Sequence, residues 1–181
     1  MTETTPAPSS SLTIGRVPSS AVLARFAESA VRDGRRLVVG ALVANAAGRI
    51  YVQKRSQTRA LFPGAWDIVG GHVEAGETVE AALGREVLEE TGWTLTGLGA
   101  VVEVIDWEAD GVRRREVDML VTVAGDLGNP RLEAGKHSEG RWLAPDEAHV
   151  LLESRTPTDV WVHTVVVRAF ELVSGVSGVS G

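Results

Sequence analysis

The sequence predicts an α/β (α+β) domain in which a mixed β-sheet lies between helices. Apolar runs with the period-two pattern of strands alternate along the chain with segments of helical period. Strands that interleave with helices are typical of sheets covered by helices. No linker or long repeat divides the 181 residues, which suffice for one domain with a real core. We therefore expect one domain at residues 19–173.

The two ends of the chain differ from this domain in composition. Residues 1–18 are rich in Thr, Ser and Pro, without the basic and apolar regions of a signal peptide, and we expect a disordered arm. Residues 174–181 repeat Ser-Gly-Val and predict a flexible tail.

The first half of the domain predicts one helix and three strands. Ser19 or Ser20 can cap the first helix, and Gly34 ends it. In chain order, we expect a helix at 21–32, a hairpin of strands 37–44 and 49–54 around a turn at 45–48, an irregular loop at 55–65, and a short strand at 66–69.

The second half predicts three helices and three strands. Thr78 can cap the first of these helices, and Gly92 fits the left-handed position that follows a helix. In chain order, we expect a helix at 79–90, an extended segment at 95–107, a turn at 108–111, a strand at 112–124, a long loop at 125–140, a short edge strand at 141–143, and helices at 145–152 and 159–173.

Composition excludes several classes of function. The net charge is −6 and the longest basic run has three arginines, so a binder of nucleic-acid duplexes is not expected. The chain has no cysteine, which excludes disulfides and thiol catalysis and is compatible with a reducing cytoplasm. No apolar run reaches the roughly 18 residues of a membrane span.

The stretch from Gly71 to Trp93 has the most chemical content. Glu86, Glu89 and Glu90 fall within roughly a 100° arc of the predicted helix. Like charges at these spacings destabilise a helix, so the three carboxylates favour a bound cation such as Mg²⁺ or Mn²⁺. The alternative is a solvated acidic face. On the opposite side of the helix we expect an apolar face formed by four residues: Ala81, Gly84, Val87 and Leu88.

This stretch resembles the Nudix box. The box has Gly, five free positions, Glu, seven free positions, and then Arg-Glu-U-X-Glu-Glu-X-Gly-U, where U is bulky and aliphatic. Its fixed positions are all met, by Gly71, Glu77, Arg85, Glu86, Glu89, Glu90 and Gly92. Val87 meets the first U position, whereas Trp93 departs from the second, a position that we assign to packing.

The resemblance implies a Nudix fold and metal-dependent hydrolysis of a diphosphate linkage, usually in a nucleotide. It implies Mg²⁺ or Mn²⁺ bound by Glu86 and Glu90, then by Glu89 and the Gly71 carbonyl. Glu77 and Arg85 would orient the loop and the carboxylates, with Glu77 a further candidate ligand. The box residues with catalytic roles are therefore expected to be Arg85, Glu86, Glu89 and Glu90.

Residues outside the box are candidates for substrate binding and for the general base. Arg55 and Arg59 can meet phosphates, and Phe62 can stack on a base. The general base is either a box glutamate or a residue of the predicted 125–140 loop, where the candidates are Glu133, His137 and Glu139. Glu139 is also a candidate substrate-binding residue.

Two other functions remain open at this point. The segment from Arg55 to His72 also resembles isoprenoid diphosphate isomerases, but those enzymes use a catalytic cysteine that this chain lacks. A non-catalytic nucleotide sensor is the second alternative, and the intact glutamate set favours turnover over sensing. The sequence leaves open which diphosphate compound is the substrate. A homodimer is possible, since dimers are common among proteins of this size.

Overall fold

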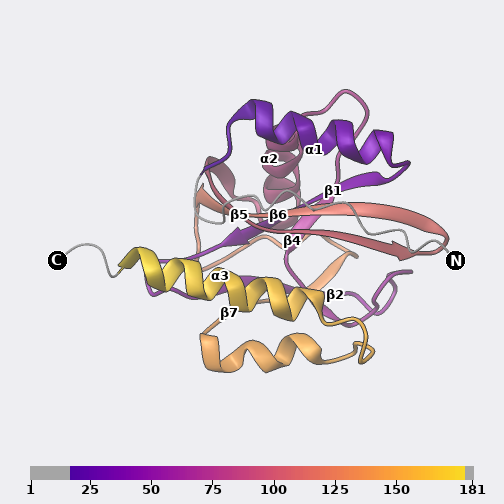
Figure 1. The fold of residues 1–181 in the computed structure, drawn as a ribbon. Helices are drawn as coiled ribbons and strands as arrows, with labels where there is room; N and C mark the ends of the chain where they lie inside the picture. The colour runs from indigo at the N-terminus through magenta and orange to yellow at the C-terminus, as the bar shows by residue number, and fades with distance from the viewer. Residues whose placement is uncertain (1–16, 178–181) are drawn as a thin grey trace, which may run out of the picture.

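The computed structural model describes residues 17–177, so most of the predicted arm and residues 178–181 of the predicted tail lie outside it. Figure 1 shows the fold. In chain order the elements are α1 (Ser20–Arg32), β1 (Arg36–Val43), β2 (Ile50–Arg55), β3 (Trp66–Asp67), β4 (Val69–His72), α2 (Val79–Thr91), β5 (Thr94–Ala109), β6 (Val112–Ala124), β7 (His137–Leu143), the 3-10 helix η1 (Pro145–Leu152) and α3 (Trp161–Ser177).

The strands form two sheets. The larger sheet has the order β4-β1-β6-β5, with β1 parallel to β6 and antiparallel to β4. The smaller sheet has the order β3-β2-β7 and is antiparallel. The predicted class, mixed strands with helices around them, is confirmed, although the strands are divided between two sheets.

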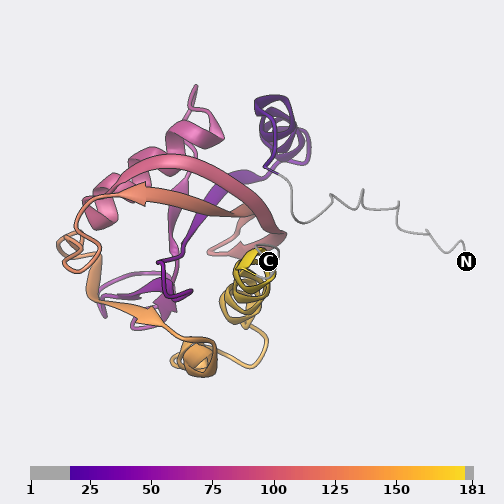
Figure 2. The same ribbon diagram turned by 90° about the vertical axis from the view of Figure 1, so that its left-hand side faces the viewer.

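Helices cover both sides of the larger sheet. In Figure 1, α1 and α2 lie above it, while α3 and η1 lie below. One apolar core joins α1 and α2 to β1 and β6, through residues such as Phe26, Leu83 and Met119. A second core joins α3 and η1 to the smaller sheet, through residues such as Ile50, Leu151 and Val166. In Figure 2, the two sheets lie opposite each other with α3 beside them.

The predicted hairpin of 37–44 and 49–54 is wrong. The Asn45 side chain accepts hydrogen bonds from Ala47 and Arg49 and holds the turn as expected. Beyond one bridge between Ala44 and Ile50, however, β1 and β2 separate and enter different sheets. Seven of the eight residues of β1 are buried, because β1 is an inner strand covered on both faces. A fully buried strand has no polar alternation that would reveal its partner.

The predicted strand at 66–69 is divided at Ile68. Trp66 and Asp67 pair with β2 in the smaller sheet, whereas Val69–His72 pair with β1 in the larger one. The chain therefore passes from one sheet to the other just before Gly70 and Gly71. This crossing places the two glycines beside α2, which contacts β4 and β5.

Smaller differences concern the boundaries of the later elements. The predicted 125–140 loop ends early because His137 begins β7, so Glu139 lies on a strand. The last helix begins at Trp161 rather than Asp159 and continues to Ser177, into the segment predicted as a tail. Across the described residues, no helix is both long and apolar enough to cross a membrane.

Candidate active site

Helix α2 begins where the sequence predicts and ends one residue later, at Thr91, with both predicted capping residues in place. The Thr78 hydroxyl accepts a hydrogen bond of 3.1 Å from the Ala81 N–H and caps the first turn. Gly92 follows the helix with a φ of 73°, a left-handed conformation that glycine adopts without a steric cost. These caps fix the ends of the helix, and thereby the direction in which its glutamates point.

The inward face of α2 carries two of the three glutamates. Glu86 and Glu90 are 7% and 5% exposed and are buried on the same helix as Ala82, Leu83 and Val87. The prediction of an apolar face that includes Leu88 and Ala81 is wrong, because both are exposed and Leu88 is 53% exposed. The alternative of a solvated acidic face is excluded for Glu86 and Glu90.

The two buried carboxylates lie against the glycines of β4. Glu90 Oε2 accepts hydrogen bonds from the Gly70 N–H at 3.1 Å and from Gln53 Nε2 at 2.5 Å. A β-carbon on Gly71 would stand 2.2 Å from Glu86 Oε1, so only glycine leaves room for this carboxylate. The Gly70-Gly71 pair therefore allows close approach of backbone and carboxylate.

Arg85 connects the loop before α2 to the glutamates. Its Nε and Nη2 atoms bind the two carboxylate oxygens of Glu77 at 2.9 and 3.0 Å. Nη2 also donates to the His72 carbonyl at 2.9 Å, and Nη1 donates to Glu86 Oε1 at 2.6 Å. Glu89 lies 3.6 Å from Nη1 and has the more exposed side chain. This bidentate geometry fixes the loop to the helix.

Burial perturbs the titration of the site. It raises the pKa of Glu90 to about 8, with a further increase from the charge of Glu86. Burial also raises the pKa of Glu86, against the opposing effect of Arg85. The hydrogen bonds from Arg85 lower the pKa of Glu77. Two carboxylates that are costly to ionise, side by side, form a site that a cation would stabilise.

A polar cleft of about 650 Å³ opens beside these residues. Its lining brings together Glu86, Glu89, Glu90, Arg85, Gly71, Arg55 and Arg59, all of which the sequence predicted for the site. It also contains Arg36, Gly70, His72, Val73, Glu74, Ala75 and Lys136. Cations and carboxylates in one cleft suit a phosphate compound that arrives with a metal ion.

Several predicted residues lie elsewhere. Phe62 is outside the lining of the cleft, and its ring packs 6.0 Å from that of Trp107 and 5.3 Å from the Arg155 guanidinium. Glu139 is exposed on β7 and also lies outside the lining. Glu133 pairs with Lys136 at 2.7 Å. Of the candidate bases outside the box, His137 is the one that lies beside a box glutamate.

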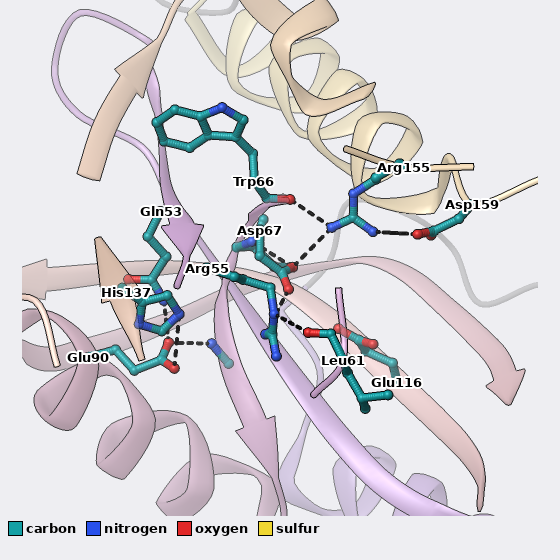
Figure 3. A network of polar contacts seen from close by, with 12 residues as sticks. Gln53, Arg55, Leu61, Trp66, Asp67, Glu90, Glu116, His137, Arg155 and Asp159 are labelled. Atoms are coloured by element: carbon teal, nitrogen blue, oxygen red, sulfur yellow. Dashed lines mark hydrogen bonds and ion pairs between the residues drawn. The ribbon is translucent and has the colours of Figure 1, made fainter. Parts of the chain in front are cut away.

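His137 and Gln53 surround Glu90 from the smaller sheet, as Figure 3 shows. His137 Nε2 lies 3.8 Å from Glu90 Oε1, and burial lowers the pKa of His137 to about 4. Gln53 was missed by the sequence analysis, because strand alternation assigns it to the polar side although it is fully buried. Lys136 and Arg36 were also missed, since neither belongs to a motif.

The donor set is suited to a hard divalent cation. Its members are oxygen atoms of Glu86, Glu89, Glu90 and the Gly71 backbone, and Mg²⁺ and Mn²⁺ prefer oxygen ligands. In the described part of the chain, no three acidic or histidine side chains converge closely enough to form a ready-made metal site. Mg²⁺ commonly binds through one or two carboxylates plus waters and substrate phosphates, so the buried Glu86 and Glu90 still fit such an ion.

Comparison with known proteins agrees with the geometry. The NUDIX domain family model matches residues 34–165. A Nudix hydrolase of Deinococcus radiodurans is 37% identical over 125 residues, which cover 66% of this chain and 69% of that protein. The nucleoside triphosphatase NudI of Escherichia coli K12 is 38% identical over 124 residues, which cover 62% of this chain and 84% of that protein.

Solved structures give the same result. The MutT NUDIX hydrolase of Burkholderia pseudomallei aligns with a TM-score of 0.60 and 28% identity, over 74% of this chain and 97% of that one. The family match spans most of this chain and includes the complete box. The protein therefore belongs to the Nudix hydrolase family and is a hydrolase that acts on phosphoric anhydrides.

Proposed function

We propose that this enzyme uses Mg²⁺ or Mn²⁺ to hydrolyse a diphosphate linkage in a nucleotide or a nucleoside-diphosphate-linked compound. The observation that carries the proposal is the position of Glu86 and Glu90, buried against Gly71 and Gly70 at a cleft that holds four basic side chains besides Arg85. These basic side chains belong to Arg36, Arg55, Arg59 and Lys136.

The site residues have different roles in this proposal. Glu86 and Glu90, with Glu89 and the Gly71 carbonyl, would hold the ion. Bound there, a divalent ion would supply neutralisation of charge on phosphate oxygens and activation of water for attack. Arg85, held by Glu77, orients the Glu86 carboxylate. The basic side chains of the cleft bind the remaining phosphate oxygens.

The nucleotide part of the proposal is supported by the relatives. NudI is named a nucleoside triphosphatase, and its alignment covers 84% of that protein. A cleft with several cations accommodates more phosphate charge than a single phosphate carries, which also favours a diphosphate or triphosphate.

A panel of diphosphate compounds tests the proposal. Nucleoside triphosphates, nucleotide sugars, ADP-ribose and dinucleoside polyphosphates are incubated with Mg²⁺, and phosphate and pyrophosphate are scored separately. We expect turnover of at least one nucleotide that a chelator abolishes and added Mg²⁺ restores. Turnover that persists in chelator contradicts the metal requirement. Tight binding of a nucleotide without any turnover supports the sensor alternative instead.

A further inference from the structure

Each of the two buried glutamates of α2 has one carboxylate oxygen held and one left free. Glu90 Oε2 accepts hydrogen bonds from Gln53 and Gly70, whereas Oε1 accepts none from the described residues. Glu86 has the same arrangement, because Oε1 accepts from Arg85 and Oε2 has no donor in the described part of the chain. Neither free oxygen is fully enclosed, and both glutamates line the cleft. Each carboxylate therefore leaves one oxygen available to a ligand.

Gln53 reaches Glu90 from the other sheet. It lies on β2 of the smaller sheet, whereas Gly70 lies on β4 of the larger sheet and Glu90 lies on α2. Gln53 Nε2 and Glu90 Oε2 are 2.5 Å apart, although the two residues are 37 positions apart in the sequence. A carboxylate can only accept, so the amide nitrogen must be the atom that faces it. Figure 3 shows the Gln53 side chain directed at Glu90.

The burial of Gln53 is not explained by packing. The residue is 0% exposed, and its amide oxygen has no hydrogen-bond partner among the described residues. A buried polar atom without a partner lowers stability, and an apolar side chain of the same length would avoid this cost. The hydrogen bond to Glu90 is the contact that only a donor at position 53 can make.

His137 does not perform the same task. Its Nε2 atom lies 3.8 Å from Glu90 Oε1, which is longer than a hydrogen bond. Among the described side chains, Gln53 is therefore the one that donates to Glu90, and the Gly70 backbone supplies the second bond. Both bonds end on the same oxygen, so together they fix the direction of the other one.

We propose that Gln53 is a positioning residue of the metal site. With the Gly70 N–H it holds Glu90 Oε2, so that Oε1 is the oxygen that would bind the ion. Arg85 acts in the same way on Glu86, whose free Oε2 would be the second ligand atom. The inference rests on the proposed function, because the metal ion is part of it. Groups that hydrogen-bond to a metal ligand typically change metal affinity 10–100-fold.

The first test is Mn²⁺ binding to the substrate-free protein, measured by electron paramagnetic resonance. Gln53→Met keeps the length of the side chain and removes the donor, so we expect Mn²⁺ to bind about 10–100-fold more weakly. Tyr51→Phe is the matched control. Tyr51 is also fully buried on β2, and its hydroxyl has no partner among the described residues, so this variant should bind Mn²⁺ within about twofold of wild type. Wild-type affinity in Gln53→Met contradicts the inference.

Thermal unfolding of the metal-free protein separates positioning from a structural role. Gln53→Met removes a buried oxygen that has no partner, so its Tm should be at least as high as that of wild type. A lower Tm with unchanged Mn²⁺ affinity would mean that Gln53 is structural. Gln53→Asn keeps the amide but is one methylene shorter, so it should also weaken Mn²⁺ binding. This second variant decides the question if Gln53→Met does not fold.

Activity provides an independent readout on the best nucleotide of the substrate panel. In Gln53→Met, the Mg²⁺ concentration for half-maximal turnover should rise about 10–100-fold, and kcat at saturating Mg²⁺ should change less. A fall in kcat at every Mg²⁺ concentration, with an unchanged half-maximal concentration, would show that Gln53 does not act through the ion. Tyr51→Phe should keep the wild-type Mg²⁺ dependence.

The outcomes separate this inference from the proposed function. If nucleotides are hydrolysed with Mg²⁺ but folded Gln53→Met and Gln53→Asn bind Mn²⁺ as wild type does, the role of Gln53 is wrong and the proposed function stands. If no compound of the panel is hydrolysed but both variants weaken Mn²⁺ binding and Tyr51→Phe does not, the proposed function fails and the role of Gln53 stands.

Discussion

The Glu86 carboxylate lies directly over the backbone of Gly71, where a β-carbon would stand 2.2 Å from Oε1. The contact joins helix α2 to strand β4 at the point where the chain has just crossed between the sheets. The Glu86 carboxylate lies so close to the Gly71 backbone that no side chain fits at position 71. The glycine is therefore a requirement of the site.

The first prediction compares two glycines. Gly71→Ala should displace Glu86 and reduce turnover by at least about 100-fold, since small misplacements of catalytic groups have effects of this size. Gly84→Ala is the control, because a β-carbon there meets only Leu95, at 3.8 Å, in a helix interior. It should preserve activity and stabilise the protein by about 1 kcal/mol. Equal activity in the two variants would show that the Gly71 contact is unimportant.

The second prediction concerns Arg85. Arg85→Lys keeps the charge but cannot reproduce the bidentate ion pair with Glu77 together with the hydrogen bonds to the His72 carbonyl and Glu86. We expect kcat to fall about 10–100-fold and half-maximal activity to require a higher Mg²⁺ concentration. Glu77→Gln should produce the same shift to a smaller extent. An unchanged Mg²⁺ dependence in both variants contradicts the orienting role.

The third prediction is a dependence of stability on pH. Burial raises the pKa of Asp118 from 3.8 to about 7, and that of Glu116 changes in the same direction. The folded state thus holds protons that the unfolded state releases, so the contribution of Asp118 to the free energy of unfolding is full below pH 4 and is lost as the pH rises toward 7.

Asp118→Asn removes one of these protons and tests that sign. Urea unfolding of wild type and variant at pH 5 and pH 8 should show that the variant gains relative stability at pH 8, by on the order of 1 kcal/mol. A relative loss at pH 8 would mean that Asp118 is stabilised as a charged group. Both proteins contain the carboxylates whose pKa is lowered, such as Glu77 and Glu147. The contribution of these groups to the pH dependence of stability therefore cancels in the comparison.

The fourth prediction is stabilisation by the metal ion alone. A ligand that binds only the folded state raises stability by mass action, so saturating Mg²⁺ should raise Tm. Each kcal/mol corresponds to about 2–4 °C for a chain of this size. Glu86→Gln should abolish the shift, whereas Glu153→Gln, at an exposed position outside the cleft lining, should keep it. A shift that survives in Glu86→Gln places the ion elsewhere.

The local pattern of the chain predicted α2 and its caps because these depend on neighbouring residues. Thr78, Gly92 and the glutamate spacing are all features of one helix. The division of β3 from β4 at Ile68 could not be predicted, since the pairing of each half is decided by partners far along the chain. The same is true of β1, whose buried faces carry no alternation.

The sequence predicted mainly those site residues that belong to the Nudix box. The sequence predicted Glu86 and Glu90 as site residues but did not predict that they are buried. It placed Leu88 on the apolar face of the helix, whereas Leu88 is exposed. Gln53 and Asp118 had no signal at all, because a polar residue on a strand is by default assigned to solvent. Their burial follows from the meeting of elements distant in sequence, which local periodicity does not encode.

The most direct measurement of the central claim is Mg²⁺-dependent hydrolysis by Glu90→Gln. The glutamine can still accept the Gly70 hydrogen bond, so the fold should survive, which circular dichroism checks. We predict a loss of turnover on the best substrate of the panel by about 10²–10⁴-fold at saturating Mg²⁺. Glu86→Gln should behave alike. Full activity in both folded variants would contradict the assignment of the metal site to these two glutamates.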